Sequence, residues 1–187
     1  MELILASASP RRRELLSLIT EDFTVCPVDA DETLRPGADL ADEVVRLSRL
    51  KADAARQRYP DAVCIGSDTL VTIDGLALGK PADTAHAAAT LRLLRGRTHE
   101  VLTGLCVLPP HQSAHTLCTR TRVKFRDFAE DELEAYLNTG EPLDKAGAYG
   151  IQGHGALLIE GIAGDYYSVM GLPVAGLQVI LREIGAV

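Results

Sequence analysis

Short apolar runs of strand length alternate with helical patterns along the first hundred residues, and this alternation restricts the fold more than any other feature. Residues 3–6 and 62–66 are compact apolar runs typical of buried strands. Residues 39–58 place apolar side chains at steps of three and four residues, as an amphipathic helix does. Two further strand-like stretches follow at 100–108 and 116–125. This order predicts an α/β fold with a mixed twisted sheet flanked by helices.

Glycine, proline and capping residues mark where the elements begin and end. Ser9 followed by Pro10 signals a helix start, and Asp74-Gly75 is typical of a hairpin turn. The strand at 62–66 is expected to continue through 70–73. The other expected elements are strands at 23–28 and 156–160, helices at 83–94, 130–137 and 174–183, a polar loop at 31–39 and an irregular glycine-rich stretch at 143–156. No repeat or linker interrupts the pattern, so residues 1–187 are expected to form one domain, as one core or two lobes.

The charge balance limits the classes of partner. The 187 residues include 26 acidic side chains and 19 Lys or Arg side chains, which gives a formal net charge of −7. General nucleic-acid binding depends on neutralising many phosphates, so the sequence predicts no nucleic-acid partner. An acidic chain can still bind a small polyanion where a few cations converge.

Cysteine usage and the lack of long apolar runs predict a cytoplasmic protein. The four cysteines form no Cys-x-x-Cys pair and three of them lie in apolar runs, which is typical of small buried hydrophobes in a reducing compartment. His111 and His115 lie in a polar loop after two prolines and make a poor zinc site. The N-terminus has no pattern of a secretion signal, and no apolar run has the length of a membrane span.

Residues 7–13, Ser-Ala-Ser-Pro-Arg-Arg-Arg, join a predicted strand to a predicted helix. A helix N-terminus favours anions, because its unpaired N–H groups and its dipole present partial positive charge. Three arginines in the first turn oppose that dipole, and a bound phosphate would resolve the conflict. Arginine also suits forked contacts to phosphate. The alternative is a solvated basic cluster, or pairing with Glu14 and more distant acids.

Two acidic segments are candidates for metal binding or proton transfer. Asp68 lies in Gly-Ser-Asp-Thr at a strand end, where a carboxylate can hold a divalent ion or accept a proton from water. Taken alone, an Asx turn or a helix cap is the commoner explanation of such a motif. Asp31 and Glu32 lie in the polar loop, where paired acids can help to hold a metal but usually face solvent.

The segment from Gly75 to Lys80 resembles a phosphate-binding P-loop only superficially. It has one residue too few between its glycines, and Pro81 stands where a Ser or Thr would bind magnesium. A hairpin turn rather than a strand precedes it. The sequence therefore excludes a P-loop, but Lys80 remains a cation close in sequence to Asp68.

Glycines are dense in residues 144–153, which predicts either close backbone approach to a ligand or left-handed turns. Gln152 supplies one donor and one acceptor, a pair that can match the imide edge of uracil or thymine. An ordinary long loop is an equally good explanation of this stretch.

Basic residues alternate with other types in the strand expected at 116–125, so that Arg120, Arg122 and Lys124 share one face, and Arg126 continues the alternation. A solvated strand face is favoured over a surface that binds nucleic acid or another partner.

The motifs taken in order resemble those of the Maf family of nucleotide pyrophosphatases. They are residues 7–12, Lys51, residues 66–69, 79–81, 144–153 and 164–173, and they cover nearly the whole chain. The resemblance implies hydrolysis of a nucleoside triphosphate to the monophosphate and pyrophosphate, with Mg²⁺ or alternatively Mn²⁺ or Co²⁺. It also implies the Ham1-like fold of the inosine triphosphate pyrophosphatases, with a cleft between two lobes, and a homodimer.

The resemblance also implies roles for individual residues. Asp68 corresponds to the family's proton acceptor, and Arg11, Thr69 and Gln152 match the branch that acts on dTTP and UTP. Glutamine suits a pyrimidine imide, whereas glutamate at that position would suit the two donors of guanine. The expected phosphate contacts are Ser7, Ser9, Arg12, Lys51 and Lys80, of which Lys80 is also catalytic, and the expected metal ligands are Glu32 and Asp68.

Three other functions stay open at this point. The same fold can act on 7-methyl-GTP or another non-standard purine nucleotide, and the predicted role of clearing non-standard nucleotides covers modified pyrimidines as well. A non-catalytic regulator of septum formation is the second alternative. The third is a nucleic-acid binder that uses the strand face formed by Arg120, Arg122, Lys124 and Arg126.

Overall fold

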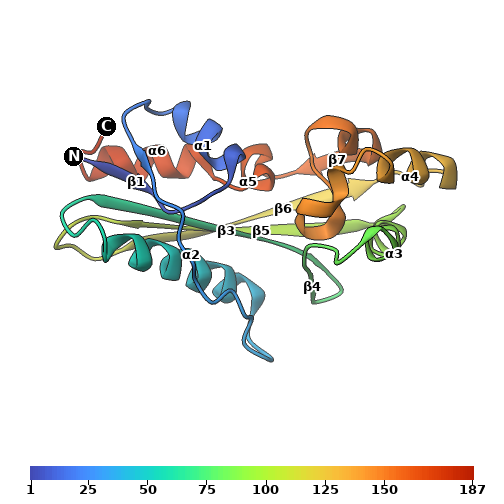
Figure 1. Cartoon of the computed structure of the whole chain (residues 1–187), viewed down its shortest axis with the longest axis horizontal. Coiled ribbons are helices and arrows are strands. Elements are labelled where there is room, and N and C mark those ends of the chain that lie inside the picture. Colours follow the sequence, from blue (N-terminus) through green and yellow to red (C-terminus); the bar gives the residue numbers. More distant parts are fainter. The chain divides into compact units, whose positions relative to one another are not determined.

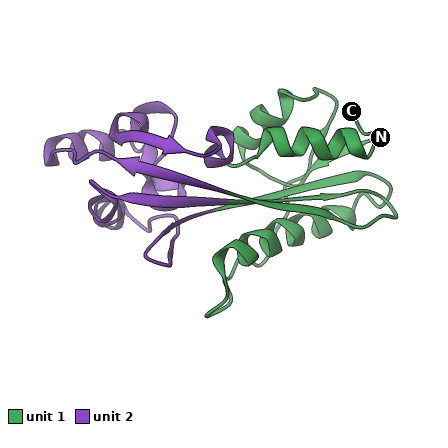
Figure 2. Ribbon diagram, turned by 180° about the vertical axis from the view of Figure 1, so that it is seen from behind, with its two compact units in different colours: residues 1–69, 103–119, 171–187 green, residues 70–102, 120–170 purple.

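The computed structural model describes all 187 residues and divides them into two compact units (Figure 2). Unit 1 comprises residues 1–69, 103–119 and 171–187, and unit 2 comprises residues 70–102 and 120–170. The prediction of two lobes agrees with this division. The predicted cleft, and the prediction of one domain over residues 1–187, stay predictions.

The strands form one mixed sheet, as the sequence predicted. Their order is β2-β1-β3-β5-β6-β7, and β4 pairs with β3. β1 is parallel to both β2 and β3, whereas β4 is antiparallel to β3 and β7 is antiparallel to β6. The strands are β1 (Leu3–Leu5), β2 (Thr24–Val25), β3 (Val63–Ile73), β4 (Leu76–Leu78), β5 (Thr98–Leu108), β6 (His115–Phe125) and β7 (Ile159–Ala163). β3, β5 and β6 each contribute residues to both units.

In unit 1 the helix α2 (Leu40–Arg56) lies on one face of the sheet, and α1 (Pro10–Ser17) and α6 (Val174–Glu183) lie on the other (Figure 1). α1 begins as predicted, with Ser9 as N-cap and Pro10 in the first turn. α2 is capped by Asp39, whose carboxylate accepts hydrogen bonds from two backbone N–H groups.

Two glycines allow α2 to approach the sheet closely. A Cβ atom at Gly66 of β3 would lie 2.1 Å from the carbonyl oxygen of Ser48, and one at Gly104 of β5 would lie 2.3 Å from that of Val44. No side chain fits in this space, so the helix backbone rests directly on these two strands. The close contact fixes which α2 side chains meet β3.

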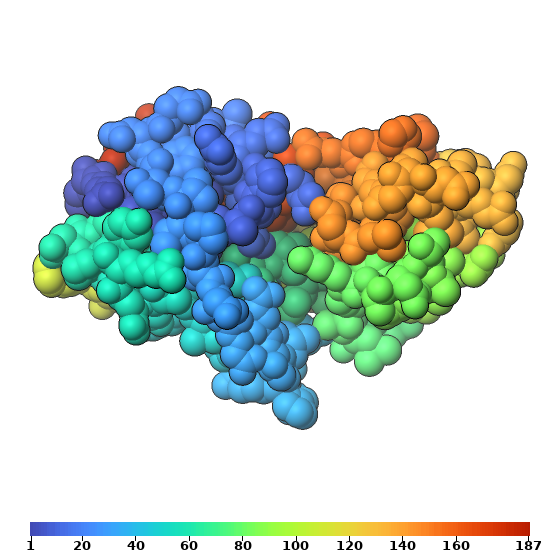
Figure 3. Space-filling view, in the orientation of Figure 1, coloured from blue at the N-terminus to red at the C-terminus, as the bar shows by residue number.

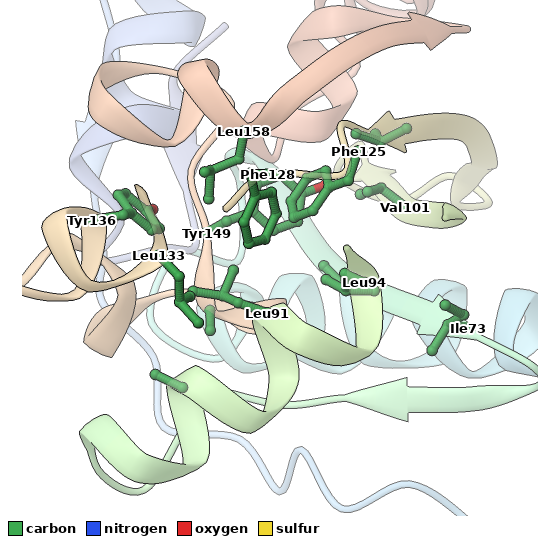
Figure 4. Packing of buried hydrophobic residues seen from close by; sticks show 14 residues of the cluster. Ile73, Leu91, Leu94, Val101, Phe125, Phe128, Leu133, Tyr136, Tyr149 and Leu158 are labelled. Atoms are coloured by element: carbon green, nitrogen blue, oxygen red, sulfur yellow. The ribbon is translucent and has the colours of Figure 1, made fainter. Parts of the chain in front are cut away.

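Unit 2 has its own core on one face of the sheet, covered by α3 (Thr84–Leu94) and α4 (Glu130–Leu137). The rings of Phe125, Phe128 and Tyr149 pack together at its centre (Figure 4). The predicted hairpin joins β3 to β4. Its turn residues, Asp74 and Gly75, have φ angles of 52° and 76°, as a type I′ turn requires.

The opposite face of the sheet in unit 2 carries the alternating basic residues. Arg120 pairs with Glu100 at 2.5 Å, and Lys124 donates to the carbonyl oxygen of Gly96 at 3.0 Å. Arg122 is exposed on the same face. Two of these three cations are therefore engaged within the protein. The preference for a solvated strand face over a partner surface stays a prediction.

Three local predictions differ from the structure. The strand expected at 156–160 begins only at Ile159, because residues 153–158 form a 3₁₀ helix that begins at left-handed Gly153. The strand expected at 23–28 is only two residues long, because β2 comprises Thr24–Val25 alone. α5 (Tyr166–Met170) was not predicted, and its start is set by Asp165, whose carboxylate accepts from the N–H groups of the second and third residues of the helix.

Three of the four cysteines are buried, as expected for those that lie in apolar runs. Cys26, Cys64 and Cys106 are buried, and burial raises the pKa of the Cys106 thiol to about 12, which makes it unreactive. None of the helices combines the length and the apolar character needed to cross a membrane.

A Gly66→Ala change should destabilise the protein by about 3 kcal/mol, because the added methyl group overlaps the backbone of α2 and the helix must shift. Chemical denaturation measures the effect. Gly161→Ala is the matched control, since a Cβ there meets nothing within 4 Å. Equal stability of the two variants would show that α2 does not rest on β3 in this way.

Candidate active site

A lysine ammonium shared by two carboxylates lies at the centre of the predicted site in unit 1. Lys51 Nζ of α2 is 2.6 Å from Asp68 Oδ1 of β3 and 2.8 Å from Glu32 Oε1. The side chains of Lys51 and Asp68 are each 9% exposed, whereas that of Glu32 is 60% exposed. A buried ammonium needs such compensation, because loss of hydration is costly for an unpaired charge.

Strand alternation divides the Gly-Ser-Asp-Thr motif between the two faces of β3. Gly66 and Asp68 face α2, where one contacts the helix backbone and the other reaches Lys51. Ser67 and Thr69 face the opposite side, where Thr69 Oγ1 accepts a hydrogen bond from Arg12 Nη2 at 3.3 Å. The motif therefore contacts both the acidic part and the basic part of the site.

Glu32 is carried by the loop at residues 31–39, which projects from the surface of unit 1 before α2 (Figure 3). The buried carboxylate of Glu43 fastens this loop to the helix. It accepts from the Arg35 N–H at 2.9 Å and from Arg46, whose Nη2 also donates to the carbonyl oxygen of Thr33 at 2.9 Å. Hydrogen bonds from Arg46 first, and then from the Arg35 N–H, lower the pKa of Glu43 to about 2.

Asp31 has a structural role in the same loop. Its Oδ1 accepts from the Thr33 N–H at 3.0 Å, which is an Asx turn. Glu32, the next residue, points to Lys51. Of the two loop acids, only Glu32 pairs with the ammonium that Asp68 also contacts.

Arg12 connects three segments of unit 1. Its Nε donates to the carbonyl oxygen of Gly171 at 2.8 Å, and its two terminal nitrogens donate to Ser7 Oγ and Thr69 Oγ1. Burial lowers the pKa of Arg12, while the charges of Asp68 and Glu32 oppose that shift. The guanidinium therefore lies within the electrostatic reach of both carboxylates.

The hydroxyl groups of Ser7 and Ser9 accept every hydrogen bond that the structure gives them. Ser7 Oγ accepts from the Ser9 N–H at 3.1 Å, and Ser9 Oγ accepts from the Arg12 N–H at 3.4 Å. A hydroxyl group can also donate one hydrogen bond. Both side chains can thus donate to a phosphate oxygen without losing a contact to the protein.

The other two arginines of the segment are less engaged. Arg11 is partly exposed and Arg13 is exposed, and the structure shows no side-chain hydrogen bond for either. The specificity role predicted for Arg11 stays a prediction, and so does the expectation that Arg13 has none.

Two predicted site residues belong to unit 2. Lys80 is exposed just after β4, and Gln152 is exposed at the start of the 3₁₀ helix at Gly153–Leu158. The Gly147 N–H donates to the carbonyl oxygen of Gly79 at 3.1 Å, so the backbones of the Lys80 and Gln152 segments are joined. The expected proximity of Lys80 to Asp68 stays a prediction.

A buried histidine contacts the start of the Gln152 segment through Tyr149. His99 Nε2 lies 2.7 Å from the hydroxyl group of Tyr149, and both residues contact the ring of Phe125. Burial lowers the pKa of His99 to about 4, so the imidazole is neutral at pH 7.

Sequence reasoning missed three residues that support Arg12. Ser67 Oγ lies 2.9 Å from the carbonyl oxygen of Gly171, which also accepts from Arg12, and Thr69 Oγ1 lies 3.1 Å from Thr103 Oγ1. Gly171 has φ 118°, and a Cβ there would lie 3.3 Å from Arg12 Nε. Ser67 and Gly171 lie in the segments 66–69 and 164–173 of the family resemblance, which was the signal that could have found them.

The acidic residues present suit a metal that also binds substrate. Glu32 and Asp68 both lie within hydrogen-bonding distance of the same ammonium, and no group of three His, Cys, Asp or Glu side chains is gathered to hold a metal ion. Mg²⁺ is typically held by one or two carboxylates together with substrate phosphates. The two carboxylates fit that type of site and not a cage made by the protein alone.

Comparison with known sequences matches nearly the whole chain. The family model described as Maf-like protein matches residues 2–184. The chain is 48% identical over 181 residues to the dTTP/UTP pyrophosphatase of Bacillus velezensis, covering 97% of this chain and 95% of that protein. It is also 48% identical over 185 residues to the protein of the same name from Thermococcus gammatolerans, covering 98% and 96%.

Comparison with solved structures confirms the expected fold. A HAM1 protein from Coxiella burnetii aligns with a TM-score of 0.52 at 14% identity, over 98% of this chain and 99% of that one. The Ham1 protein of Staphylococcus aureus aligns with a TM-score of 0.50 at 16% identity, over 68% and 73%. At these identities the likeness concerns the fold alone.

The low pKa of His99 predicts a loss of stability in mild acid. The unfolded chain binds a proton near pH 6.5 and the folded chain only near pH 4, so the contribution is complete above pH 6.5 and is lost as the pH falls to 4. The loss should be on the order of 3 kcal/mol. Denaturation at pH 7 and pH 4.5 should show a smaller decrease for His99→Gln than for the unmodified protein, and equal decreases would contradict the prediction.

Proposed function

Because the chain belongs to the Maf family, we propose that it hydrolyses dTTP and UTP to the nucleoside monophosphate and pyrophosphate. Two relatives that are 48% identical over nearly their whole length carry the name dTTP/UTP pyrophosphatase. The observation that carries the proposal is the arrangement around Asp68. A buried carboxylate and a second, exposed carboxylate share one ammonium, within the electrostatic reach of a guanidinium that donates to the hydroxyl groups of Ser7 and Thr69.

Asp68 is proposed as the proton acceptor. Its Oδ1 is bonded to Lys51 at 2.6 Å, which leaves Oδ2 as the oxygen that can face a water molecule. The water oxygen forms a bond to the α-phosphorus, the bond from that phosphorus to the bridging oxygen breaks, and pyrophosphate leaves. The proton of the water passes to Asp68. Lys51 then acts by fixing the orientation of Asp68.

The basic residues and hydroxyls are proposed to bind the phosphates. Ser7 and Ser9 donate hydrogen bonds, and Arg12 supplies positive charge at the start of α1. Lys80 is proposed to neutralise the departing pyrophosphate. Positioning and electrostatic stabilisation are the main catalytic contributions in such reactions.

Glu32 and Asp68 are proposed to hold a divalent ion, Mg²⁺ or alternatively Mn²⁺ or Co²⁺. When bound, the ion would neutralise negative charge on the phosphates. The direct contact of Lys51 with both carboxylates argues against its predicted role as a phosphate contact, because its charge is already compensated within the protein. We therefore propose that Lys51 serves chiefly to position the two acids.

The base is proposed to contact Gln152, whose amide offers the donor and acceptor that an imide edge requires. Thr69 is bonded to Arg12 and Thr103, so its proposed effect on specificity is exerted through Arg12. Arg11 is proposed as the third specificity position. Non-standard purines and a purely regulatory role are less well supported, since the named relatives act on pyrimidine nucleotides.

On the family resemblance we also propose a cytoplasmic homodimer that clears non-standard nucleotides, modified pyrimidines included. No membrane or nucleic-acid partner is proposed.

Turnover of a nucleotide panel with Mg²⁺ tests the function directly. Pyrophosphate and the monophosphate should form fastest from dTTP and UTP, and Asp68→Asn should lower kcat by about 10²- to 10⁴-fold, the usual contribution of a general base. Asp53→Asn removes a carboxylate of α2 that pairs with Arg49 and should leave turnover unchanged. Turnover of UTP by Asp68→Asn within a few-fold of normal would overturn the assignment.

Lys80→Ala should lower kcat about 10- to 100-fold with KM nearly unchanged, since the charge on the leaving group grows in the transition state. Steady-state kinetics with UTP measures both constants. Lys124→Ala removes a charge from the sheet face of unit 2 and serves as the control. An effect on KM alone would argue against this role of Lys80.

A further inference from the structure

The segment that carries Gln152 folds around the carboxylate of Glu141. Glu141 Oε2 accepts from the His154 N–H at 3.0 Å, and Oε1 accepts from the Gly155 N–H at 3.2 Å. Glu141 lies in the 3₁₀ turn at Glu141–Asp144, and its side chain is only 17% exposed. The carboxylate is therefore satisfied mainly by the backbone that immediately follows Gln152.

The backbone before Gln152 is tied to the same group. The hydroxyl group of Tyr136 donates to Glu141 Oε1 at 3.2 Å and accepts from the Gly150 N–H at 3.2 Å. The backbone N–H groups of three residues near Gln152 are thus hydrogen-bonded to side chains, those of Gly150, His154 and Gly155. The acceptors are the Tyr136 hydroxyl group and the Glu141 carboxylate, which are themselves hydrogen-bonded to each other.

The same contacts leave no room for a side chain at Gly153 and add to the close packing at Gly155. A Cβ at Gly153 would lie 2.8 Å from Glu141 Oε2, and one at Gly155 would lie 2.2 Å from the carbonyl oxygen of Gly150 and 2.9 Å from the Tyr136 hydroxyl oxygen. Gly153 also has a φ angle of 69°, which residues other than glycine rarely adopt. The close backbone approach expected from the sequence is thus an approach to the protein's own carboxylate.

The side chain of Gln152 has no such support of its own. It is exposed, and it makes no capping hydrogen bond at the start of the 3₁₀ helix that follows it. Its position is therefore set by the backbone on either side. Recognition by two hydrogen bonds to a planar imide requires that position to be held closely.

We propose that Glu141 is a specificity-positioning residue, which holds the Gln152 segment in place and so sets the preference for a pyrimidine imide. The inference rests on the proposed function, in which Gln152 contacts the base. Glu141 itself contacts the loop and not the substrate. Its effect should therefore appear in selectivity between nucleotides more than in the chemical step.

The primary test is Glu141→Gln, which places an amide NH₂ group against a backbone N–H donor. The ratio of kcat/KM for UTP to kcat/KM for GTP should fall at least tenfold through a higher KM for UTP, with kcat within about threefold. Tyr136→Phe, which removes the link to Gly150, should lower the ratio in the same direction. Hydrogen exchange of the amides at 150–155 should quicken in both variants.

A double-mutant cycle separates positioning from general damage to the fold. If Glu141 acts through Gln152, then Glu141→Gln should change selectivity little in a Gln152→Ala background. Glu132→Gln is the matched control, because Glu132 also bonds a backbone N–H, that of Ala129, and lies in the same unit. That variant should lose stability without any change in selectivity.

The outcomes distinguish the inference from the function on which it rests. If the unmodified protein shows no preference for UTP over GTP, the proposed base recognition is wrong and the inference is wrong with it. If the protein prefers UTP and Gln152→Ala abolishes the preference, but Glu141→Gln preserves it, the proposed function stands and the inference is overturned. A loss of selectivity in Glu132→Gln equal to that in Glu141→Gln would also overturn it.

Discussion

The buried ammonium of Lys51 is the interaction on which the candidate site in unit 1 depends. It joins a strand carboxylate, Asp68, to a loop carboxylate, Glu32, which are 36 residues apart in the sequence. Removing one partner of a buried ion pair typically costs about 3–5 kcal/mol, since the remaining charge stays buried without compensation. The arrangement is possible only because Gly66 and Gly104 let α2 lie against the sheet. Close helix packing and the chemistry of the site are therefore one constraint.

Local signals determined how much of the fold could be predicted. α2, α4 and α6 lie within one or two residues of the expected ranges, because apolar periodicity is set by near neighbours. The hairpin at Asp74-Gly75 was predicted from turn chemistry and is present. The 3₁₀ helix at 153–158 was missed, since it depends on contacts with Glu141, which is distant from it in the sequence.

For the candidate site, the structure shows which of the expected residues lie together, while their roles stay predictions. Motif resemblance identified Arg12, Lys51 and Asp68, which the structure brings together with Glu32. No sequence pattern indicated that two acids compensate Lys51, or that buried Glu43 holds the loop of Glu32 against α2. These arrangements are tertiary, and an isolated acid or base in a helix pattern looks like any solvent-facing charge.

The alternation along β3 has a consequence for how such a protein can change over evolution. Gly66 and Asp68 contact α2, whereas Ser67 and Thr69 lie on the side of Arg12. Consecutive residues therefore contact different parts of the protein. Inserting or deleting one residue in this strand would reverse every side chain beyond it and exchange the two sets. The strand can therefore tolerate some substitutions, but it cannot tolerate the insertion or deletion of a single residue. Insertions and deletions should be tolerated better in the surface loops, where no alternation of side chains between two faces has to be kept.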